Sequence, residues 1–524
     1  MKEKMEKKKM NKLVKGGLVL GKRNKKEKEE IYFIDKDTHT LILGATRSGK
    51  GRTVVMQTLC TLGLAGESMI ITDPKSELFD YTSQFLKWLG YQIITIDFKN
   101  PKKSHRWNFL QIVNNSIDQG DIPGAVDAAW DITSQLVGEP KGEKLWNNGE
   151  AATIAASIMA VCYDNRAPEN HKYRNLLNVY FFLIEMCTEI EIGNKKKLPL
   201  TRYVEDIPEN HPARGILAIS SIAPSRTRSS FYTSALITLR LFTNPLIADM
   251  TSQSDYDCMA IGKDKTAIFI MLPDEKKTYY SIASLYVAQQ YAMLSKSADL
   301  RGGRLEKRVN YIMDEFGNFA QIPIMTNMLT VGGGKGIRFN LFVQDFAQIE
   351  EKYEKVGART IMSNCETWLY LQSDDNDTLE AISKKLGKYT TQTYSLSSSN
   401  QKYGSSTSGN NVSLTGRDLL TPAEVKKIHR PYNLVTSRND PAVFYSPDLS
   451  QWNFNKVLGL GNEEHNRKIR LARENMRPER KVSEKLELWG IWNIYKEAIV
   501  NQQKKEQMKE QRELFADMMS NMNF

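Results

Sequence analysis

The chain has 524 residues, of which 41% are hydrophobic and 25% charged, and its net charge is +11. These values are typical of a globular protein with about two to four domains, and they exclude a fibrous or fully disordered chain. No apolar run approaches the roughly 20 residues that span a bilayer. The 5 cysteines and 6 histidines are scattered without a CxxC pair, which excludes a disulfide framework and a zinc signature.

Positive charge is concentrated at the start of the chain. Residues 1–30 hold 12 Lys or Arg and 5 Asp or Glu, a surplus of seven positive charges. No apolar core follows, so the segment is not a signal peptide. We expect a basic N-terminal tail over residues 1–30 that either contacts anionic lipid or DNA, or is simply solvated.

Four short apolar runs end abruptly in a small or polar residue, and such runs are typical of buried parallel strands. In open α/β sheets, ligands bind beyond the carboxyl ends of the strands, so we expect these four residues on one rim. They are Gly44, Asp73, Asp314 and Gln344. A further strand is expected in "TAIFIMLP", residues 266–273.

Between the strands, stretches such as "AVDAAWDITSQLVG" have apolar residues at helical spacing. The predicted fold class is therefore α/β, with an all-α domain inserted in a nucleotide-binding domain and a charged helical C-terminal tail. The expected boundaries are 31–114 and 246–460 for the two parts of the nucleotide-binding domain, 115–245 for the all-α domain, and 461–524 for the tail.

Two further segments carry expectations of their own. Residues 395–411 are rich in Ser and Gly, which predicts a loop that contacts substrate or is merely an expansion. In the tail, four apolar residues recur at helical spacing, and we expect this stripe to pack on its own domain rather than on a partner. They are Leu488, Trp492, Tyr495 and Ile499.

The stretch "LILGATRSGKGRT", residues 41–53, matches a phosphate-binding loop except at one position. Position 51 is Gly, so the hydroxyl that usually ligates magnesium is missing, and we expect Thr53 or a water to replace it. Backbone N–H groups of the loop would surround the β-phosphate, and Lys50 would reach the β- and γ-phosphates. The predicted nucleotide-binding residues are Gly44, Ala45, Thr46, Arg47, Ser48, Gly49, Lys50, Gly51, Arg52 and Thr53.

The second half of an ATPase site is an apolar strand that ends in acid, and "VNYIMDEF", residues 309–316, supplies one. We expect Asp314 to hold Mg²⁺, partly through water, and Glu315 to orient and activate the attacking water. Gln344 follows the next strand, where its amide would contact the γ-phosphate or the attacking water. The predicted cofactors are therefore ATP and Mg²⁺.

These residues resemble those of a known family. From about residue 40 to 430 the chain is similar to the type IV coupling proteins, the TraG-like ATPases of conjugative DNA transfer. Members of that family often carry GKG in the phosphate loop, so Gly51 is part of the resemblance. Its main motifs are "GATRSGKG", "DPKSELF", "RWNFL", "LWNNGEAATIAASIM", "FIMLPDE", "DEFGNFAQIP", "GKGIRFNLFVQDFAQIEEKY", "SNCETWLYLQSDDNDTLEAISKKLG" and "GRDLLTPAEV".

The resemblance implies a RecA-like domain with an inserted all-α domain, and a hexameric ring with ATP sites between subunits. It implies recruitment of a relaxase and single-stranded DNA, and their delivery to a type IV secretion channel. The partners would be the channel ATPases and a membrane-anchored protein. The location would be cytoplasmic, peripheral at the inner face of the cell membrane.

The chain departs from the family in two respects. Family members usually begin with a transmembrane region, so this chain is either a truncated form or relies on a separate membrane partner. Many relatives also have an arginine near position 333 that reaches a neighbour's phosphate, whereas this chain has Gly333. Arg417 is the arginine expected to act in its place, with Lys335 and Arg338 as alternatives.

DNA contacts are expected from Lys335 and Arg338, or from the basic and aromatic residues of "SRTRSSFY", residues 225–232. An ordinary helix with a solvated charged face explains the latter stretch equally well. A metabolic kinase fits the long helical insertion poorly, and a double-stranded DNA pump would need a C-terminal winged helix. A docking receptor that binds ATP without pumping remains the main alternative function.

Overall fold

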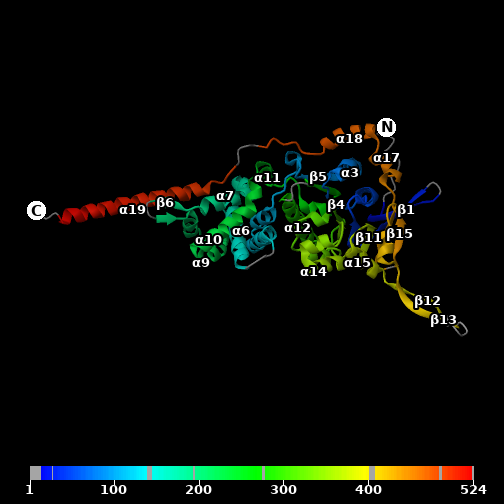
Figure 1. Cartoon of the computed structure of the whole chain (residues 1–524). Helices are drawn as coiled ribbons and strands as arrows, with labels where there is room; N and C mark the ends of the chain where they lie inside the picture. Colours follow the sequence, from blue (N-terminus) through cyan, green and yellow to red (C-terminus); the bar gives the residue numbers. More distant parts are fainter. Residues whose placement is uncertain are drawn as a thin grey trace. The chain divides into compact units, whose positions relative to one another are not determined.

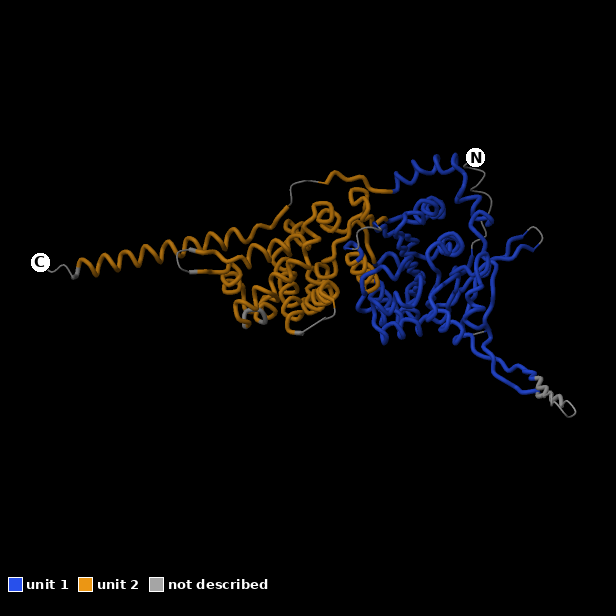
Figure 2. Tube along the Cα trace, viewed as in Figure 1, with its two compact units in different colours: residues 1–94, 259–280, 294–476 blue, residues 95–258, 281–293, 477–524 orange. Residues whose placement is uncertain are grey.

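The computed structural model describes residues 13–25, 28–138, 144–192, 195–273, 278–399, 407–438, 440–482 and 487–521. The chain forms two compact units, shown in different colours in Figure 2. Unit 1 comprises residues 1–94, 259–280 and 294–476, and unit 2 comprises residues 95–258, 281–293 and 477–524.

Unit 1 is built on a nine-stranded sheet with the order β15-β14-β11-β3-β10-β9-β4-β8-β5 (Figure 1). The pairs that join β11, β3, β10, β9, β4 and β8 are parallel, and β14 and β15 are added antiparallel at one edge. The predicted strands are confirmed. Their bounds are β3 Thr40–Gly44, β4 Ser68–Thr72, β5 Gln92–Asp97, β8 Thr266–Met271, β9 Val309–Met313, β10 Ile337–Val343, β11 Thr367–Gln372, β14 Tyr432–Thr436 and β15 Ala442–Tyr445.

The central strands are apolar because both faces of the sheet are covered. Every residue of β3, β4 and β9 is buried, as expected for parallel strands between helices. Alternate side chains such as Ile42, Ile71 and Phe269 pack on one face against β1, α2 and α3. The helices of unit 1 are α2 Met56–Ala65, α3 Glu77–Trp88, α13 Met325–Val331, α14 Ala347–Asn364, α15 Asn376–Leu386, α16 Pro422–Lys426, α17 Asn455–Leu458 and α18 Glu463–Glu474, and α12 Thr278–Asp299 has residues in both units.

The expectation of a basic tail over residues 1–30 needs correction. Strands β1 (Leu18–Lys25) and β2 (Lys28–Ile34) form an antiparallel hairpin instead. Leu18 and Val19 are buried in the core of unit 1, and burial of these apolar side chains outweighs the local surplus of charge. Residues 1–12 lie outside the described part of the chain.

The Ser-rich stretch 395–411 also differs from the expected loop. Strands β12 (Lys388–Ser399) and β13 (Thr407–Asp418) pair antiparallel over their whole length. Figure 1 shows them as a long hairpin of unit 1. Serine and threonine can complete a backbone ladder without an apolar face, which is why composition alone misjudged this segment. Residues 400–406 lie outside the described ranges.

Unit 2 is mostly helical. It also contains a short antiparallel hairpin of β6 (Ile190–Ile192) and β7 (Lys195–Lys197), which the helical spacing did not indicate. The predicted domain boundaries at residues 115 and 245 remain a prediction. The helices are α4 Gln111–Asp118, α5 Ile122–Val137, α6 Lys144–Asp164, α7 Leu176–Met186, α8 Pro199–Asp206, α9 Pro212–Ile222, α10 Ser225–Leu239, α11 Pro245–Met250 and α19 Ile491–Asn521.

The apolar stripe near the C-terminus packs on unit 2 through Trp492 and Tyr495, as expected, but Leu488 is not part of the helix, because α19 begins at Ile491. The ring of Trp492 stacks on Phe181, and that of Tyr495 meets Tyr203 edge to face, with centroids 6.4 and 5.6 Å apart. These contacts hold the first turns of α19 against α7 and α8. Among the described residues, no helix combines the length and apolar composition needed to cross a membrane.

Candidate functional site

The phosphate loop connects β3 to the helical segment that begins at Gly51 and continues as α2. A Cβ at Gly44 would lie 2.5 Å from the Ser48 hydroxyl and 3.0 Å from the Lys50 side chain, so a larger residue there would displace these two groups of the loop. Gly49 has a φ of +84°, a left-handed conformation that glycine adopts without strain. These two positions explain why the loop needs its glycines.

Lys50 lies at the mouth of the loop. Its ammonium group donates a hydrogen bond to the Gly44 carbonyl at 2.5 Å. Burial lowers the pKa of Lys50, and the carboxylates of Asp314 and Glu315 oppose that change. The sheet therefore brings together the lysine and the two acids that the sequence predicted as one site.

Asp314 and Glu315 follow β9 on the same rim. The Thr72 hydroxyl, at the end of β4, donates to the Asp314 carbonyl at 2.8 Å. Burial raises the pKa of the Asp314 carboxyl to about 6, and Lys50 opposes this shift. Glu315 has a φ of +54°, and Asn318 donates to its carboxylate at 2.7 Å. Asn318 thus orients the side chain predicted to activate water.

Gln344 connects the rim to the phosphate loop. Its side-chain oxygen accepts a hydrogen bond from the Thr46 hydroxyl at 3.2 Å, and its backbone N–H donates to the Gln348 side chain at 2.9 Å. Lys50, Glu315, Asn318, Gln344 and Gln348 line one narrow cavity. Sequence reasoning missed Asn318 and Gln348, although their short spacing from Glu315 and Gln344 was the available signal.

Thr53 was expected to replace the hydroxyl that is missing at Gly51, but its own hydroxyl is engaged within the phosphate loop. Thr53 is buried, and its hydroxyl donates to the Gly49 carbonyl at 3.0 Å. That hydrogen bond lies inside the loop and gives no support to Thr53 as a magnesium ligand, which remains a prediction. A Cβ at Gly51 would meet no heavy atom within 4 Å. The absent hydroxyl at position 51 is therefore not explained by crowding.

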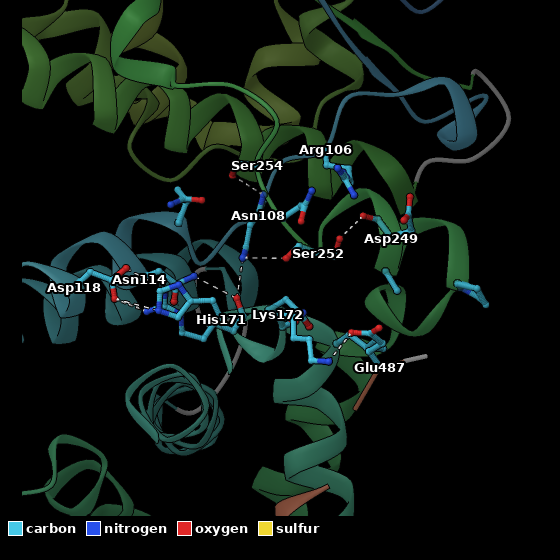
Figure 3. Close-up of a pocket in the computed structure, with 17 residues that line it drawn as sticks. Arg106, Asn108, Asn114, Asp118, His171, Lys172, Asp249, Ser252, Ser254 and Glu487 are labelled. Carbon is cyan, nitrogen blue, oxygen red and sulfur yellow. Dashed lines mark hydrogen bonds and ion pairs between the residues drawn. The ribbon is translucent and has the colours of Figure 1, made fainter. Parts of the chain in front are cut away.

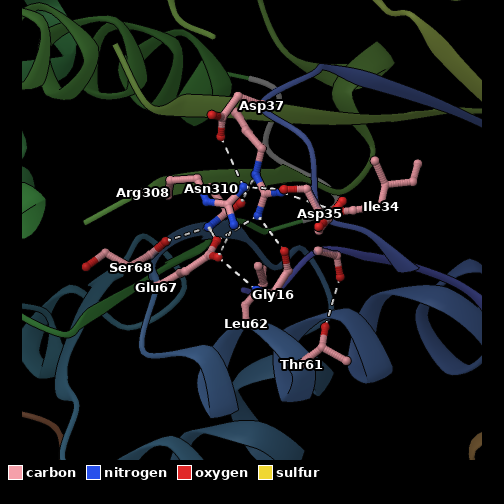
Figure 4. A network of polar contacts seen from close by, with 12 residues as sticks. Gly16, Ile34, Asp35, Asp37, Thr61, Leu62, Glu67, Ser68, Arg308 and Asn310 are labelled. Carbon is pink, nitrogen blue, oxygen red and sulfur yellow. Dashed lines mark hydrogen bonds and ion pairs between the residues drawn. The ribbon is translucent and has the colours of Figure 1, made fainter. Parts of the chain in front are cut away.

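The geometry overturns one arginine candidate. Arg338 is only 3% exposed, and its guanidinium donates to Glu67 and to Asn310, each at 2.7 Å. Figure 4 labels Glu67 and Asn310 in this network, together with Arg308. Arg308 donates to the other oxygen of Glu67, also at 2.7 Å. Because it is buried in this network, Arg338 can neither line a DNA channel nor reach a neighbouring subunit.

Lys335 and Arg417, the other basic residues predicted to contact DNA or a neighbour's phosphate, are not held in a buried network like that of Arg338. Lys335 pairs with Asp299 at 2.7 Å, and Arg417 on β13 pairs with Glu424 at 2.6 Å. The role of Arg417 at a neighbour's phosphate remains a prediction. Phe231 and Tyr232 are buried, so they cannot stack on DNA bases, and the interpretation of "SRTRSSFY" as a DNA site is wrong for its aromatic residues.

A separate polar cavity of about 700 Å³ lies in unit 2 (Figure 3). Arg174 donates to Asp118 at 2.6 Å, Asn108 donates to the Arg174 carbonyl at 2.8 Å, and Lys172 pairs with Glu487 at 3.4 Å. None of the predicted site residues lines this cavity. The chemistry of the phosphate loop belongs to unit 1.

Residues 1–446 match the family model described as "Type IV secretory system Conjugative DNA transfer". The chain belongs to this family. The match covers most of the chain and includes the phosphate loop, the acidic strand end and Gln344. It confirms the resemblance to type IV coupling proteins that the motifs indicated.

Two relatives illustrate this conjugative DNA transfer family. Protein VirD4 of Rhizobium rhizogenes is 24% identical over 414 residues, covering 77% of this chain and 57% of VirD4. The conjugal transfer protein TraG of Escherichia coli is 25% identical over 412 residues, covering 75% of this chain and 62% of TraG. The chain thus spans less than two thirds of the length of these relatives.

Solved structures agree on the fold. The plasmid coupling protein TrwB in complex with ADP and Mg²⁺ superposes with a TM-score of 0.57 at 16% identity, covering 81% of this chain and 88% of that one. A trigonal form of TrwB lacking its N-terminal segment, in complex with sulphate, gives a TM-score of 0.58 at the same identity, covering 81% and 88%. At this identity the likeness shows the fold alone.

Proposed function

We propose that the chain is an ATP-hydrolysing coupling protein of conjugative DNA transfer. The observation that carries this proposal is the placement of Lys50 and Glu315 in the lining of one cavity, beyond the ends of β3 and β9 in the same sheet, with Asp314 next to Glu315. A protein that only bound ATP would need the lysine but not a glutamate held by Asn318. Family membership and the fold shared with TrwB, whose solved complex contains ADP and Mg²⁺, support the proposal.

The residues divide the work of hydrolysis between them. Backbone N–H groups of the phosphate loop, such as those of Gly49 and Lys50, hold the phosphates, and the Lys50 side chain neutralises charge on the β- and γ-phosphates. Glu315, oriented by Asn318, accepts a proton from the attacking water. Gln344 contacts the γ-phosphate or that water, and its hydrogen bond to Thr46 links this contact to the loop.

Mg²⁺ fits the site through Asp314. Within the described ranges, no group of three or more His, Cys, Asp or Glu side chains is arranged to hold a metal ion. Mg²⁺ needs only one or two carboxylates, because phosphate oxygens and waters complete its shell. When bound with ATP, the ion would supply charge neutralisation at the phosphates. Asp314 would hold it, partly through water.

The proposed role in DNA transfer is taken from the family. We propose that the chain recruits a relaxase with single-stranded DNA and delivers the DNA to a type IV secretion channel. In this proposal it works as a hexamer with Arg417 facing a neighbour's phosphate, peripheral at the inner face of the membrane. Its partners there are the channel ATPases and a membrane-anchored protein. The helical segment 115–245 acts as a separate domain of this machine.

ATP hydrolysis by the purified chain, with and without single-stranded DNA, tests the proposal beside Glu315→Gln. We expect low basal turnover, stimulation by DNA, and loss of both in the variant. Tight ATP binding without hydrolysis under any of these conditions would instead favour a docking receptor that links substrate to the channel.

A further inference from the structure

The two sides of the sheet that flank the phosphate loop carry different residues. Strand β3, which leads into the loop, has β10 and β9 on one side and β11 and β14 on the other. Glu315 and Gln344 follow β9 and β10. If the chain binds ATP as proposed above, the γ-phosphate belongs on their side. The sugar and base must then leave the loop on the side of β11 and β14.

On that side, a segment spanning residues 430–448 borders the loop through three contacts. Together they span the loop from its middle to the first helical turn. Arg430 donates to the Arg47 carbonyl, the Ser446 hydroxyl donates to the Thr53 carbonyl, and Arg52 pairs with Asp448, each at 2.8 Å.

Arg430 is the residue of this segment that sits over the loop. A Cβ on Gly49 would lie 2.6 Å from a guanidinium nitrogen of Arg430, so the group lies directly above the glycine. Arg430 is exposed, and within the described part of the chain its guanidinium donates one hydrogen bond, to the Arg47 carbonyl. The planar guanidinium of Arg430, which has five N–H donors, is thus held by one edge on the side of the phosphate loop where the sugar and base would lie.

We propose that Arg430 forms the nucleobase subsite, with its guanidinium plane stacked on the base. The hydrogen bond to Arg47 fixes the position of the plane, and the outer face receives the base. Guanidinium groups stack on aromatic rings, and every base offers a π-face. The subsite therefore accepts purine nucleoside triphosphates without selecting adenine over guanine. This inference rests on the proposed function, because it assumes that the loop binds nucleotide phosphates.

The test compares ligands with and without a base. ATP, GTP and inorganic tripolyphosphate are titrated with Mg²⁺ into the full chain and into its Arg430→Ala and Arg430→Lys variants. We expect the wild type to bind ATP and GTP alike. Arg430→Ala should weaken both by about tenfold and leave tripolyphosphate unchanged. Arg430→Lys keeps the charge and a donor to Arg47 but loses the plane, so most of the loss should remain.

The matched control is Arg438→Ala, because the side chain of Arg438 is 84% exposed and pairs with Glu366 rather than with the phosphate loop. It should change none of the three affinities. Equal weakening of ATP and tripolyphosphate in Arg430→Ala would overturn the base subsite, since Arg430 would then act on the phosphates or the loop. Strong preference for ATP over GTP would overturn it as well.

Failure of the inference and failure of the proposed function give different results. If tripolyphosphate binds the wild type as tightly as ATP does, the base makes no contact, and the subsite is wrong while the phosphate site stands. If the wild type binds neither, the proposed nucleotide site itself is wrong. Retained binding of tripolyphosphate by Arg430→Ala also shows that the variant is folded.

Discussion

Arg338 offers a direct test of the structure against the expectation of a DNA-contacting arginine. Its guanidinium donates hydrogen bonds to Glu67 and Asn310 at 2.7 Å each, and to the backbone carbonyls of Gly16, Ile34 and Lys36 at 3.2 to 3.4 Å. Arg338→Ala removes these bonds and leaves the buried carboxylate of Glu67 with Arg308 as its remaining ion-pair partner, besides hydrogen bonds from the Gly16 N–H and the Asn310 amide. Breaking a buried ion pair costs about 3–5 kcal/mol. Because Arg308 stays, we expect a loss of about 3 kcal/mol, at the lower end of that range.

Hydrogen exchange followed by mass spectrometry measures this loss locally, without assuming that the two units unfold together. Amides of β9 and β10, the strands that carry Asn310 and Arg338, should exchange about a hundredfold faster in Arg338→Ala. Arg304→Ala is the matched control. It breaks an ion pair with Asp37 in which Arg304 is 48% exposed, and exposed pairs contribute about 0–1 kcal/mol.

Unchanged exchange in β9 and β10 of Arg338→Ala would refute the buried network. If the same variant also lost affinity for single-stranded DNA, the sequence-based assignment of Arg338 to a DNA surface would be restored. Faster exchange with unchanged DNA affinity is the result that the structure predicts.

Two further predictions concern the loop and the sheet beneath it. Gly51→Ser should lower the Mg²⁺ concentration needed for half-maximal ATP binding, because its hydroxyl adds a ligand in open space; Gly51→Ala should not, and equal effects of both variants would contradict this. Burial lowers the pKa of His39 to about 4, and its ring nitrogen accepts from the Phe339 N–H at 3.0 Å. The unfolded chain takes up a proton near pH 6.5 but the folded chain only near pH 4, so stability should fall as pH drops through this window, by up to about 3 kcal/mol. Urea unfolding at several pH values measures this fall, and His39→Asn, which keeps an acceptor but does not titrate, should remove that part of the pH dependence.

Local sequence determined much of this protein. Short apolar runs ending at Gly44, Asp314 and Gln344 predicted the parallel strands, because strands buried on both faces need continuous apolar residues. The spacing of Gly44, Gly49 and Lys50 predicted the phosphate loop, because that backbone turn depends on residues next to one another in the sequence. Helical spacing likewise predicted that the stripe around Trp492 would pack on its own unit.

Tertiary structure decided what each charged side chain does. Arg338 and Arg430 look alike in the sequence, yet one is buried against Glu67 and the other lies exposed above Gly49. Nothing in the sequence around either residue distinguishes them, because Glu67, the ion-pair partner of Arg338, and Arg47, the partner of Arg430, lie hundreds of positions away along the chain. The order of the strands sets those partners, and it places β9 and β10 on one side of the loop and β14 on the other.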